Sequence, residues 1–177
     1  MTITEAIRQQ RKNGIGGTDT AQILGLSTYG TPLAVYDSKV LELPREQDAD
    51  RFWWGNACEK IVAERIWYDL RQSKQYRGRR LIEPKGMMWH PNKIAFGNPD
   101  RVLIDKKSGK WLAGYECKWI DGSNRDEWTT EKDPTVRLPV MYFIQAFHYL
   151  MVARANGHDL DRWWVVAVLG GNDARYY

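Results

Sequence analysis

One short segment, Gly97 to Trp119, constrains the fold of this chain more than any other. Asp100 ends the sequence Gly-Asn-Pro-Asp, and sixteen residues later the sequence Glu-Cys-Lys begins at Glu116. Side chains two residues apart in a β-strand lie on the same face, so Glu116 and Lys118 project together and Cys117 projects from the other face. The segment predicts two neighbouring strands, with an acid on one and an acid and a lysine on the next.

This pattern is the one by which metal-dependent phosphodiesterases assemble their site. Asp100 and Glu116 can share divalent cations, which prefer oxygen ligands, and Lys118 then lies beside the attacking water. The pattern is degenerate by itself, because the same spacing occurs by chance in many chains. Its meaning depends on the residues found elsewhere in the sequence.

Composition bounds the kind of protein that the chain can form. It has 177 residues, 43% of them hydrophobic, which favours one globular domain with a substantial core. We expect no membrane association, since no apolar run reaches the roughly 18–20 residues that span a bilayer and the N-terminus lacks the apolar core of a signal peptide. A net charge of +4 and a pI near 9.0 permit nucleic acid as a partner without requiring it.

The two cysteines, Cys58 and Cys117, show no CxxC or Cys/His spacing. Both are flanked by motif residues on apolar faces, so we expect buried thiols in a reducing cytosol. Two cysteines cannot supply the four thiolates that clasp an iron–sulfur cluster, which excludes a nuclease of that kind.

The hydrophobic period changes along the chain from helical to strand-like. Helical spacing with end signals comes first, and a period of two follows, with a turn at Lys107–Gly109. This order predicts an α/β fold, a central mixed β-sheet flanked by helices, in a single domain over residues 1–177. Its expected parts are N-terminal helices in 1–70, a sheet in 81–119, and a flanking helix with a last strand in 139–170. The predicted helices cover residues 4–12, 18–24, 32–40, 54–70 and 139–155, and the predicted strands cover residues 87–89, 94–96, 101–104, 111–119 and 163–169.

Glu59 lies on the long predicted helix at the margin of its buried face, close to Val62 and Ile66. A carboxylate placed there needs a partner, because burial of an unpaired charge is costly. A salt bridge to a nearby arginine would satisfy it. A metal shared with Asp100 and Glu116 would satisfy it equally well, since three carboxylates suit a hard cation such as Mg²⁺.

The predicted helix over residues 139–155 carries two stripes at helical spacing. One stripe is polar-tipped and consists of Tyr142, Gln145 and Tyr149. It is either a helix flank with three half-buried polar groups or a face that looks into the site, where Gln145 would hydrogen-bond the water or phosphate near the metal. The other stripe is apolar and consists of Val140, Phe143, Ile144, Phe147, Leu150 and Met151.

The segment Arg11 to Asp19 is rich in glycine. Glycines let the backbone approach a ligand closely, and a helix that begins at Thr18 directs free N–H groups toward an anion. The Thr18 hydroxyl and the Arg11 guanidinium would complete a pocket for a phosphate group. Taken alone, however, a glycine-rich turn is better explained as a plain helix cap.

Together these motifs resemble the lambda-type exonucleases of phage recombination systems, the YqaJ-like viral recombinase family within the PD-(D/E)xK nuclease superfamily. Their order and spacing fit this family over most of the chain, and the combination is specific although each part is weak. One departure is Thr18, which stands where serine is more usual and keeps the hydroxyl. The matching positions are Arg11 with Gly14–Asp19, Trp54-Gly55 with Glu59, Gly97–Asp100, Glu116–Lys118, and Tyr142 and Gln145 with Tyr149.

The resemblance implies a PD-(D/E)xK restriction-endonuclease-like core and a metal-dependent exonuclease. Such an enzyme digests one strand of linear double-stranded DNA from the 5′ end, leaves a 3′ overhang and releases mononucleotides. The resemblance also implies two Mg²⁺ ions, for which Mn²⁺ can substitute. Lys118 would act on the nucleophilic water and Gln145 would lie near the site. By the same resemblance, the metal ligands are Asp100, Glu116, Glu59 and the backbone carbonyl of Cys117, the 5′-phosphate is held by Arg11 and Thr18, and the DNA is contacted by Tyr142 and Tyr149.

Partners and cellular setting are likewise implied by the resemblance alone. The partners are double-stranded DNA ends, a single-strand annealing protein and further copies of the chain in a ring-shaped trimer. The setting is the cytoplasm of a bacterial host that carries a phage or prophage.

Two alternatives stay open. An endonuclease with the same core would cut internally and digest closed circular duplex, but an internal cut offers no terminal phosphate for an Arg11–Thr18 pocket. A catalytically silent DNA-binding protein would bind without cleavage and would be expected to lack part of the acid–lysine set. Asp100, Glu116 and Lys118 are all present.

Overall fold

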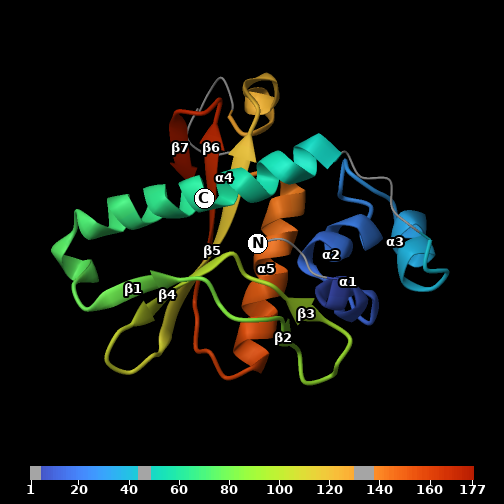
Figure 1. The fold of residues 1–177 in the computed structure, drawn as a ribbon, viewed down its shortest axis with the longest axis horizontal. Coiled ribbons are helices and arrows are strands. Elements are labelled where there is room, and N and C mark those ends of the chain that lie inside the picture. The colour runs from blue at the N-terminus through green and yellow to red at the C-terminus, as the bar shows by residue number, and fades with distance from the viewer. Residues whose placement is uncertain (1–4, 44–48, 130–137) are drawn as a thin grey trace.

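The computed structural model describes residues 5–43, 49–129 and 138–177 of the chain (Figure 1). It has three layers: helix α4 (Ala49–Arg71), a five-stranded sheet, and helix α5 (Val140–Ala155). The remaining α-helices gather beside α5, at the end of the molecule opposite the C-terminal end of α4 (Figure 1). These helices are α1 (Glu5–Lys12), α2 (Gly17–Ile23) and α3 (Pro32–Lys39).

The central sheet is mixed, as the sequence predicts. Its strands are β1 (Arg79–Ile82), β4 (Arg101–Asp105), β5 (Trp111–Ile120), β6 (Trp163–Leu169) and β7 (Asp173–Tyr176), and they lie side by side in that order. Neighbouring strands are antiparallel except β5 and β6, which are parallel and are connected through α5. A parallel pair needs such a crossover, because the chain must return to the same end of the sheet.

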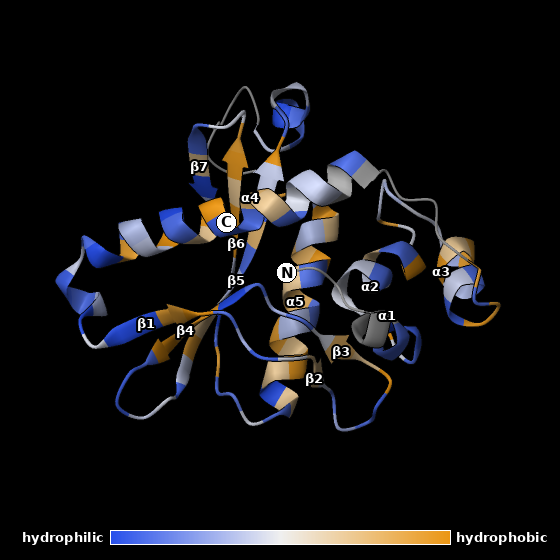
Figure 2. Ribbon diagram, in the orientation of Figure 1, coloured by the Kyte–Doolittle hydropathy of each residue, from blue (hydrophilic) through white to orange (hydrophobic). Residues whose placement is uncertain are grey.

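Strand β6 divides the core into two halves, since alternate side chains point to opposite faces of a sheet. Val166 and Val168 pack in the cluster that α4 covers, and Val165, Ala167 and Leu169 pack in the cluster that α5 covers. Both faces of β6 are therefore buried, and the strand is apolar along its whole length (Figure 2).

Helix α4 is predicted by the helical spacing of Cys58, Ile61, Val62, Ile66 and Leu70. The structure buries four of these side chains, but Ile61 is 53% exposed, so its predicted place on the buried face is wrong. The helix begins at Ala49, five residues before the predicted start at Trp54. The added turn contains Asp50, and an acidic side chain in the first turn of a helix stabilises it through the helix dipole.

Helix α5 is rotated relative to what its apolar stripe suggests. Gln145, His148 and Tyr149 are buried, because each of them has hydrogen-bond partners inside the protein. Four residues of the apolar stripe face outward instead, each between 41% and 61% exposed: Val140, Phe143, Phe147 and Met151.

A small antiparallel pair, β2 (Met88–Trp89) with β3 (Phe96–Gly97), leads into the Gly97–Asp100 segment. A parallel bridge between Ile15 and Ala95 joins the glycine-rich N-terminal loop to this pair. Two motifs that are distant in sequence are thus held next to each other.

Helix α2 begins one residue earlier than predicted. Its N-cap is Gly16, and the carboxylate of Asp19 accepts a hydrogen bond from the Gly16 N–H at 2.9 Å. The sequence predicts a cap at Thr18-Asp19, and of these two residues Asp19 supplies the capping oxygen, whereas Thr18 lies exposed within the first turn.

Four short elements are absent from the sequence prediction. Strands β1 and β7 lie at the two edges of the sheet, have four residues each and carry several charged side chains, so their hydrophobic alternation is weak. The other two are 3₁₀ helices, η1 (Lys74–Tyr76) and η2 (Gly122–Glu127).

Both cysteines, Cys58 and Cys117, are buried free thiols, which confirms that part of the prediction. Among the described helices, none combines the length and the apolar character needed to cross a membrane.

Candidate active site

The candidate site lies where β4 and β5 part. Their pairing ends at Arg101 opposite Tyr115, while β5 continues along β6 to its end. Asp100 directly precedes β4, and its Oδ2 atom accepts a hydrogen bond from the backbone N–H of Cys117 at 2.7 Å. The carboxylate thus occupies the position of a further backbone acceptor, which fixes Asp100 beside β5.

Glu116 and Lys118 share one face of β5, as predicted, and Lys118 Nζ lies 2.7 Å from Glu116 Oε1. Gln145 donates a hydrogen bond from Nε2 to the same oxygen at 2.5 Å. The second oxygen, Glu116 Oε2, is buried and has no hydrogen-bond partner among the described residues. A buried carboxylate oxygen in this state is costly unless a further donor or a cation reaches it.

The polar stripe of α5 faces this cluster. Gln145 Nε2 also lies 3.2 Å from the Tyr149 hydroxyl, which accepts its hydrogen bond. The ring of Tyr142 lies 5.2 Å from Lys118 Nζ, a cation–π distance. The sequence allows two interpretations of this stripe. In the structure the stripe faces the acids and the lysine.

Burial and neighbouring carboxylates raise the pKa of both acids. The pKa of Asp100 is well above its usual range, first because of burial and then because of Glu116. Burial also raises the pKa of Glu116, although Lys118 opposes the change. Burial alone would lower the pKa of Lys118, but the carboxylates of Glu116 and Asp100 outweigh it and raise that pKa. The site therefore carries more negative charge than its lysine neutralises, which favours an additional cation.

Glu59 reaches the site from α4 and is paired with an arginine. Its Oε1 atom accepts a hydrogen bond from Arg101 Nη1 at 2.6 Å. The same guanidinium donates to the carbonyl oxygen of Asp100 and lies 3.8 Å from Glu83 Oε2. Of the two partners that the sequence leaves open for Glu59, the arginine is the one that it contacts.

The donor set suits a hard divalent cation. Asp100 and Glu116 offer carboxylate oxygens, the ligands that Mg²⁺ prefers, and Glu116 Oε2 is available. Within the described ranges, no three or more His, Cys, Asp or Glu side chains are arranged to hold one metal ion, and Glu59 contacts Arg101. The residues thus fit a cation at Asp100 and Glu116, with Glu59 held apart by Arg101.

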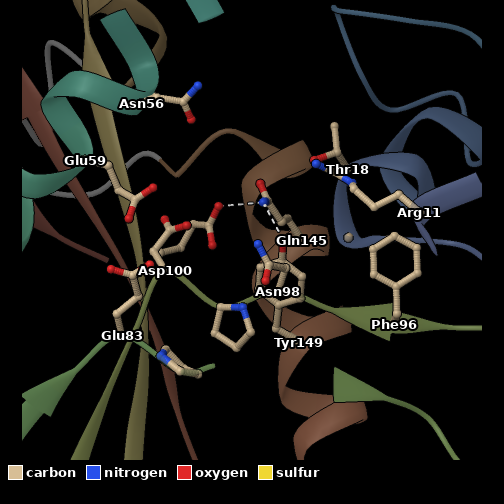
Figure 3. Close-up of a pocket in the computed structure, with 15 residues that line it drawn as sticks. Arg11, Thr18, Asn56, Glu59, Glu83, Phe96, Asn98, Asp100, Gln145 and Tyr149 are labelled. Atoms are coloured by element: carbon tan, nitrogen blue, oxygen red, sulfur yellow. Dashed lines mark hydrogen bonds between the residues drawn. The ribbon is translucent and has the colours of Figure 1, made fainter. Parts of the chain in front are cut away.

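A cavity of about 170 Å³ connects the acids with the N-terminal motif. Figure 3 shows Arg11 and Thr18 on one side of Gln145, and Glu59 and Asp100 on the other. The cavity also contains Glu116 and Tyr149 in its wall, together with Asn98 of the Gly97–Asp100 motif. Three further residues of the wall are ones that the sequence does not single out: Asn56, Glu83 and Phe96.

A second cavity of about 780 Å³ lies on the far side of the same acids. Lys118, Tyr142 and Cys117 line it, and so do Glu59, Asp100 and Glu116. The carboxylates therefore form a partition between two cavities. Each of the predicted site residues lines at least one of them.

Lys39, on helix α3, holds the cavity wall that contains Arg11. Lys39 Nζ lies 2.8 Å from Asp19 Oδ2, in an ion pair that is almost entirely buried, and it donates to the carbonyl oxygen of Arg11 at 2.5 Å. Gly17 permits close packing on α5, because a Cβ atom there would lie 2.9 Å from side-chain carbons of Gln145 and Tyr149.

Arg101 and His148 are the main residues that sequence reasoning missed. Arg101 had a signal: an arginine at a strand position next to Asp100 must find a carboxylate if it is buried. For His148 the sequence offers only one signal, its position on the helix next to residues that are buried. Its Nε2 atom faces the carbonyl oxygen of Phe96 and its Nδ1 atom faces the Thr20 hydroxyl, both at 2.9 Å.

The chain is similar to known proteins over most of its length. A model of the YqaJ-like viral recombinase domain matches residues 8–156. "Uncharacterized protein YqaJ" of Bacillus subtilis (strain 168) is 30% identical over 165 residues, which is 92% of this chain and 46% of that protein, so the chain spans about half the length of this curated relative.

Among solved structures, the fold matches the crystal structure of LHK-Exo in complex with dAMP. The TM-score is 0.67 and the sequence identity is 13%, over 98% of this chain and 80% of that one. At this level of identity the likeness concerns the fold, a mixed sheet flanked by helices. By its sequence match over residues 8–156, the chain belongs to the YqaJ-like viral recombinase family.

Proposed function

We propose that this protein is a Mg²⁺-dependent exonuclease that degrades one strand of linear double-stranded DNA from the 5′ end and produces 3′ overhangs for recombination. The observation that carries the proposal is the cavity that Arg11 and Thr18 share with Asp100 and Glu116. Arg11 and Thr18, which would bind a terminal phosphate, line the same cavity as the two acids that would bind the metal. A DNA end would need both groups, one for its phosphate and the other for its scissile bond.

Asp100 and Glu116 would hold the metal, with the carbonyl oxygen of Cys117 as a further ligand. When bound, a divalent cation polarises the scissile phosphate and lowers the pKa of the attacking water. Lys118, held against Glu116, would donate to that water or to the phosphate and stabilise the charge that develops there. Gln145 would keep the Glu116 carboxylate in a single orientation.

Arg11 and Thr18 would bind the terminal 5′-phosphate. Arginine matches phosphate geometry with two parallel N–H donors, and a hydroxyl adds a third donor. Tyr149 lines the same cavity and would contact the terminal nucleotide, while Tyr142 lines the second cavity and would contact the DNA on the far side of the acids. A terminal pocket next to the acids supports an exonuclease over an enzyme that cuts internally.

The decisive assay uses linear duplex with either a 5′-phosphate or a 5′-hydroxyl, in the presence of Mg²⁺. We expect mononucleotide release, faster from the phosphorylated end by about tenfold to a hundredfold, the value of one or two charge-assisted hydrogen bonds. Closed circular duplex should remain intact, and Asp100→Asn should abolish release. Nicking of the circle would instead indicate an endonuclease, and binding without any cleavage would indicate a silent DNA-binding protein.

The proposed partners follow from the same function. We propose that the protein acts on duplex DNA ends in the cytoplasm of a bacterial host, with Mn²⁺ able to replace Mg²⁺. A single-strand annealing protein would take up the 3′ overhang, and a trimer of the chain would encircle the DNA. Because binding would rest on phosphate contacts, activity should fall as the salt concentration rises, and a level response would contradict this footprint.

A further inference from the structure

Arg101 is a buried cation inside the acidic cluster. Only 8% of the residue is exposed. Its guanidinium is committed to the acids around it, through Glu59 Oε1 at 2.6 Å, Glu83 Oε2 at 3.8 Å and the carbonyl oxygen of Asp100. A buried guanidinium cannot leave such partners without a large penalty, so it is a permanent part of the site.

The guanidinium contacts Glu59 from inside the protein. Arg101 pairs with Tyr115, whose side chain lies in the core cluster under α4, and α4 is the helix that carries Glu59. Glu59 is part of the wall of both cavities, whereas Arg101 is in the wall of neither as far as the described residues define them. Glu59 therefore has a fixed cation on its inner side, bound to its Oε1 atom.

The charge balance leads to a definite number of metal ions. Four carboxylates face two cationic side chains, so two formal negative charges remain, which is the charge that one divalent ion cancels. A second divalent ion would leave an excess of positive charge and would compete with the guanidinium for Glu59. The carboxylates are Glu59, Glu83, Asp100 and Glu116, and the cations are Arg101 and Lys118.

We propose that the Arg101 guanidinium pairs with the Glu59 carboxylate in place of a second metal ion. The site then binds one divalent cation, with Asp100 and Glu116 as its ligands. This inference rests on the proposed nuclease function. It replaces the two metal ions that the family resemblance implies by a single metal ion. Arg101 is then a positioning residue that sets the number of metal ions, and Glu59 serves as its counter-ion.

The test counts Mn²⁺ ions bound to the protein without DNA, by electron paramagnetic resonance of the free ion. Wild-type protein should bind one ion per chain, and Glu59→Gln should still bind one. Arg101→Met, which removes the charge and keeps much of the volume, should gain a second ion whose spin couples to the first. Arg101→Lys, the matched control that keeps a cation, should remain at one.

Two ions on the wild-type protein, with one lost in Glu59→Gln, would overturn the proposal and leave the nuclease function standing. A single ion on a natively folded Arg101→Met, judged by circular dichroism, would also overturn it. If Arg101→Met does not fold, the counts for wild-type protein and Glu59→Gln decide the matter by themselves. Absence of bound Mn²⁺ together with absence of DNA cleavage would overturn the nuclease function and this proposal with it.

Discussion

The Gln145 amide and the Glu116 carboxylate meet across 2.5 Å, so helix α5 fixes one oxygen of an acid whose other oxygen has no hydrogen-bond partner among the described residues. Lys118 contacts the same fixed oxygen. The helix that connects the parallel strands β5 and β6 thus also sets the direction in which Glu116 presents its remaining lone pairs.

Gln145→Leu should lower kcat by about 10- to 100-fold, the usual effect of losing a group that orients a metal ligand. KM for DNA should change little, because Gln145 acts through Glu116 and not through the phosphate backbone. Steady-state kinetics on linear duplex measures both constants. Met151→Leu, on the exposed side of the same helix, serves as the control and should behave as wild type. A normal kcat for Gln145→Leu would show that Gln145 does not orient Glu116 for catalysis.

Asp100→Asn should be inactive and yet more stable than the wild type. Burial and Glu116 raise the pKa of the Asp100 carboxyl, so ionised Asp100 destabilises the native state at neutral pH. We therefore expect the free energy of unfolding in EDTA to be higher for Asp100→Asn than for the wild type. The gain should shrink as the pH falls, because the native carboxyl takes up a proton before the unfolded one does. Urea unfolding at several pH values would show it, and a less stable variant at pH 7 would contradict it.

Lys39→Met should destabilise the protein and weaken the preference for a 5′-phosphate. The substitution removes the cation from a buried carboxylate, Asp19, which typically costs about 3 kcal/mol, and releases the carbonyl oxygen of Arg11. Lys12→Met, which breaks an exposed pair with Glu42, is the matched control and should cost less than about 1 kcal/mol. Denaturation, combined with rates on phosphorylated and hydroxyl ends, separates the two effects. Equal losses in both variants would contradict the bracing of Arg11 by Lys39.

His148 should make stability depend on pH below neutrality. Burial lowers its pKa, so the native state favours the neutral ring, while the unfolded ring takes up a proton near pH 6.5. The stabilisation is complete above that pH and is lost as the pH falls toward the native pKa, at up to about 1.4 kcal/mol per pH unit. Unfolding free energies of wild-type protein and His148→Gln, which cannot titrate, should differ by a constant amount above pH 7.5 and converge below pH 6.5. A constant difference over the whole range would exclude a role for this ring.

Local patterns predict much of the site because they describe neighbours in sequence. The two-residue spacing of Glu116 and Lys118 is a property of any strand, and the Thr31-Pro32 start of α3 is a property of any helix cap, with Thr31 Oγ1 accepting from the Ala34 N–H. The helix and strand order then leads to the mixed sheet.

Other features depend on which surfaces meet, and no local pattern contains that information. The ion pair of Arg101 with Glu59 joins residues 42 positions apart, and the bridge of His148 to Phe96 spans 52. The outward stripe of α5 is a further case, because hydrogen bonds of Gln145 and His148 decide the rotation of the helix against its hydrophobicity. The edge strands β1 and β7 are stabilised by a neighbour on one side and carry little periodicity of their own.

The bond from the Cys117 N–H to Asp100 ties an acidic side chain to the main chain. Every residue except proline carries that N–H, so the anchor survives almost any substitution at position 117. The placement of the acids is therefore robust to evolutionary drift, and the surrounding side chains can change while the spacing persists. Insertions in the Lys107–Gly109 turn should be tolerated over long divergence, whereas a one-residue slip of β5 would turn Glu116 to the opposite face and end activity at once.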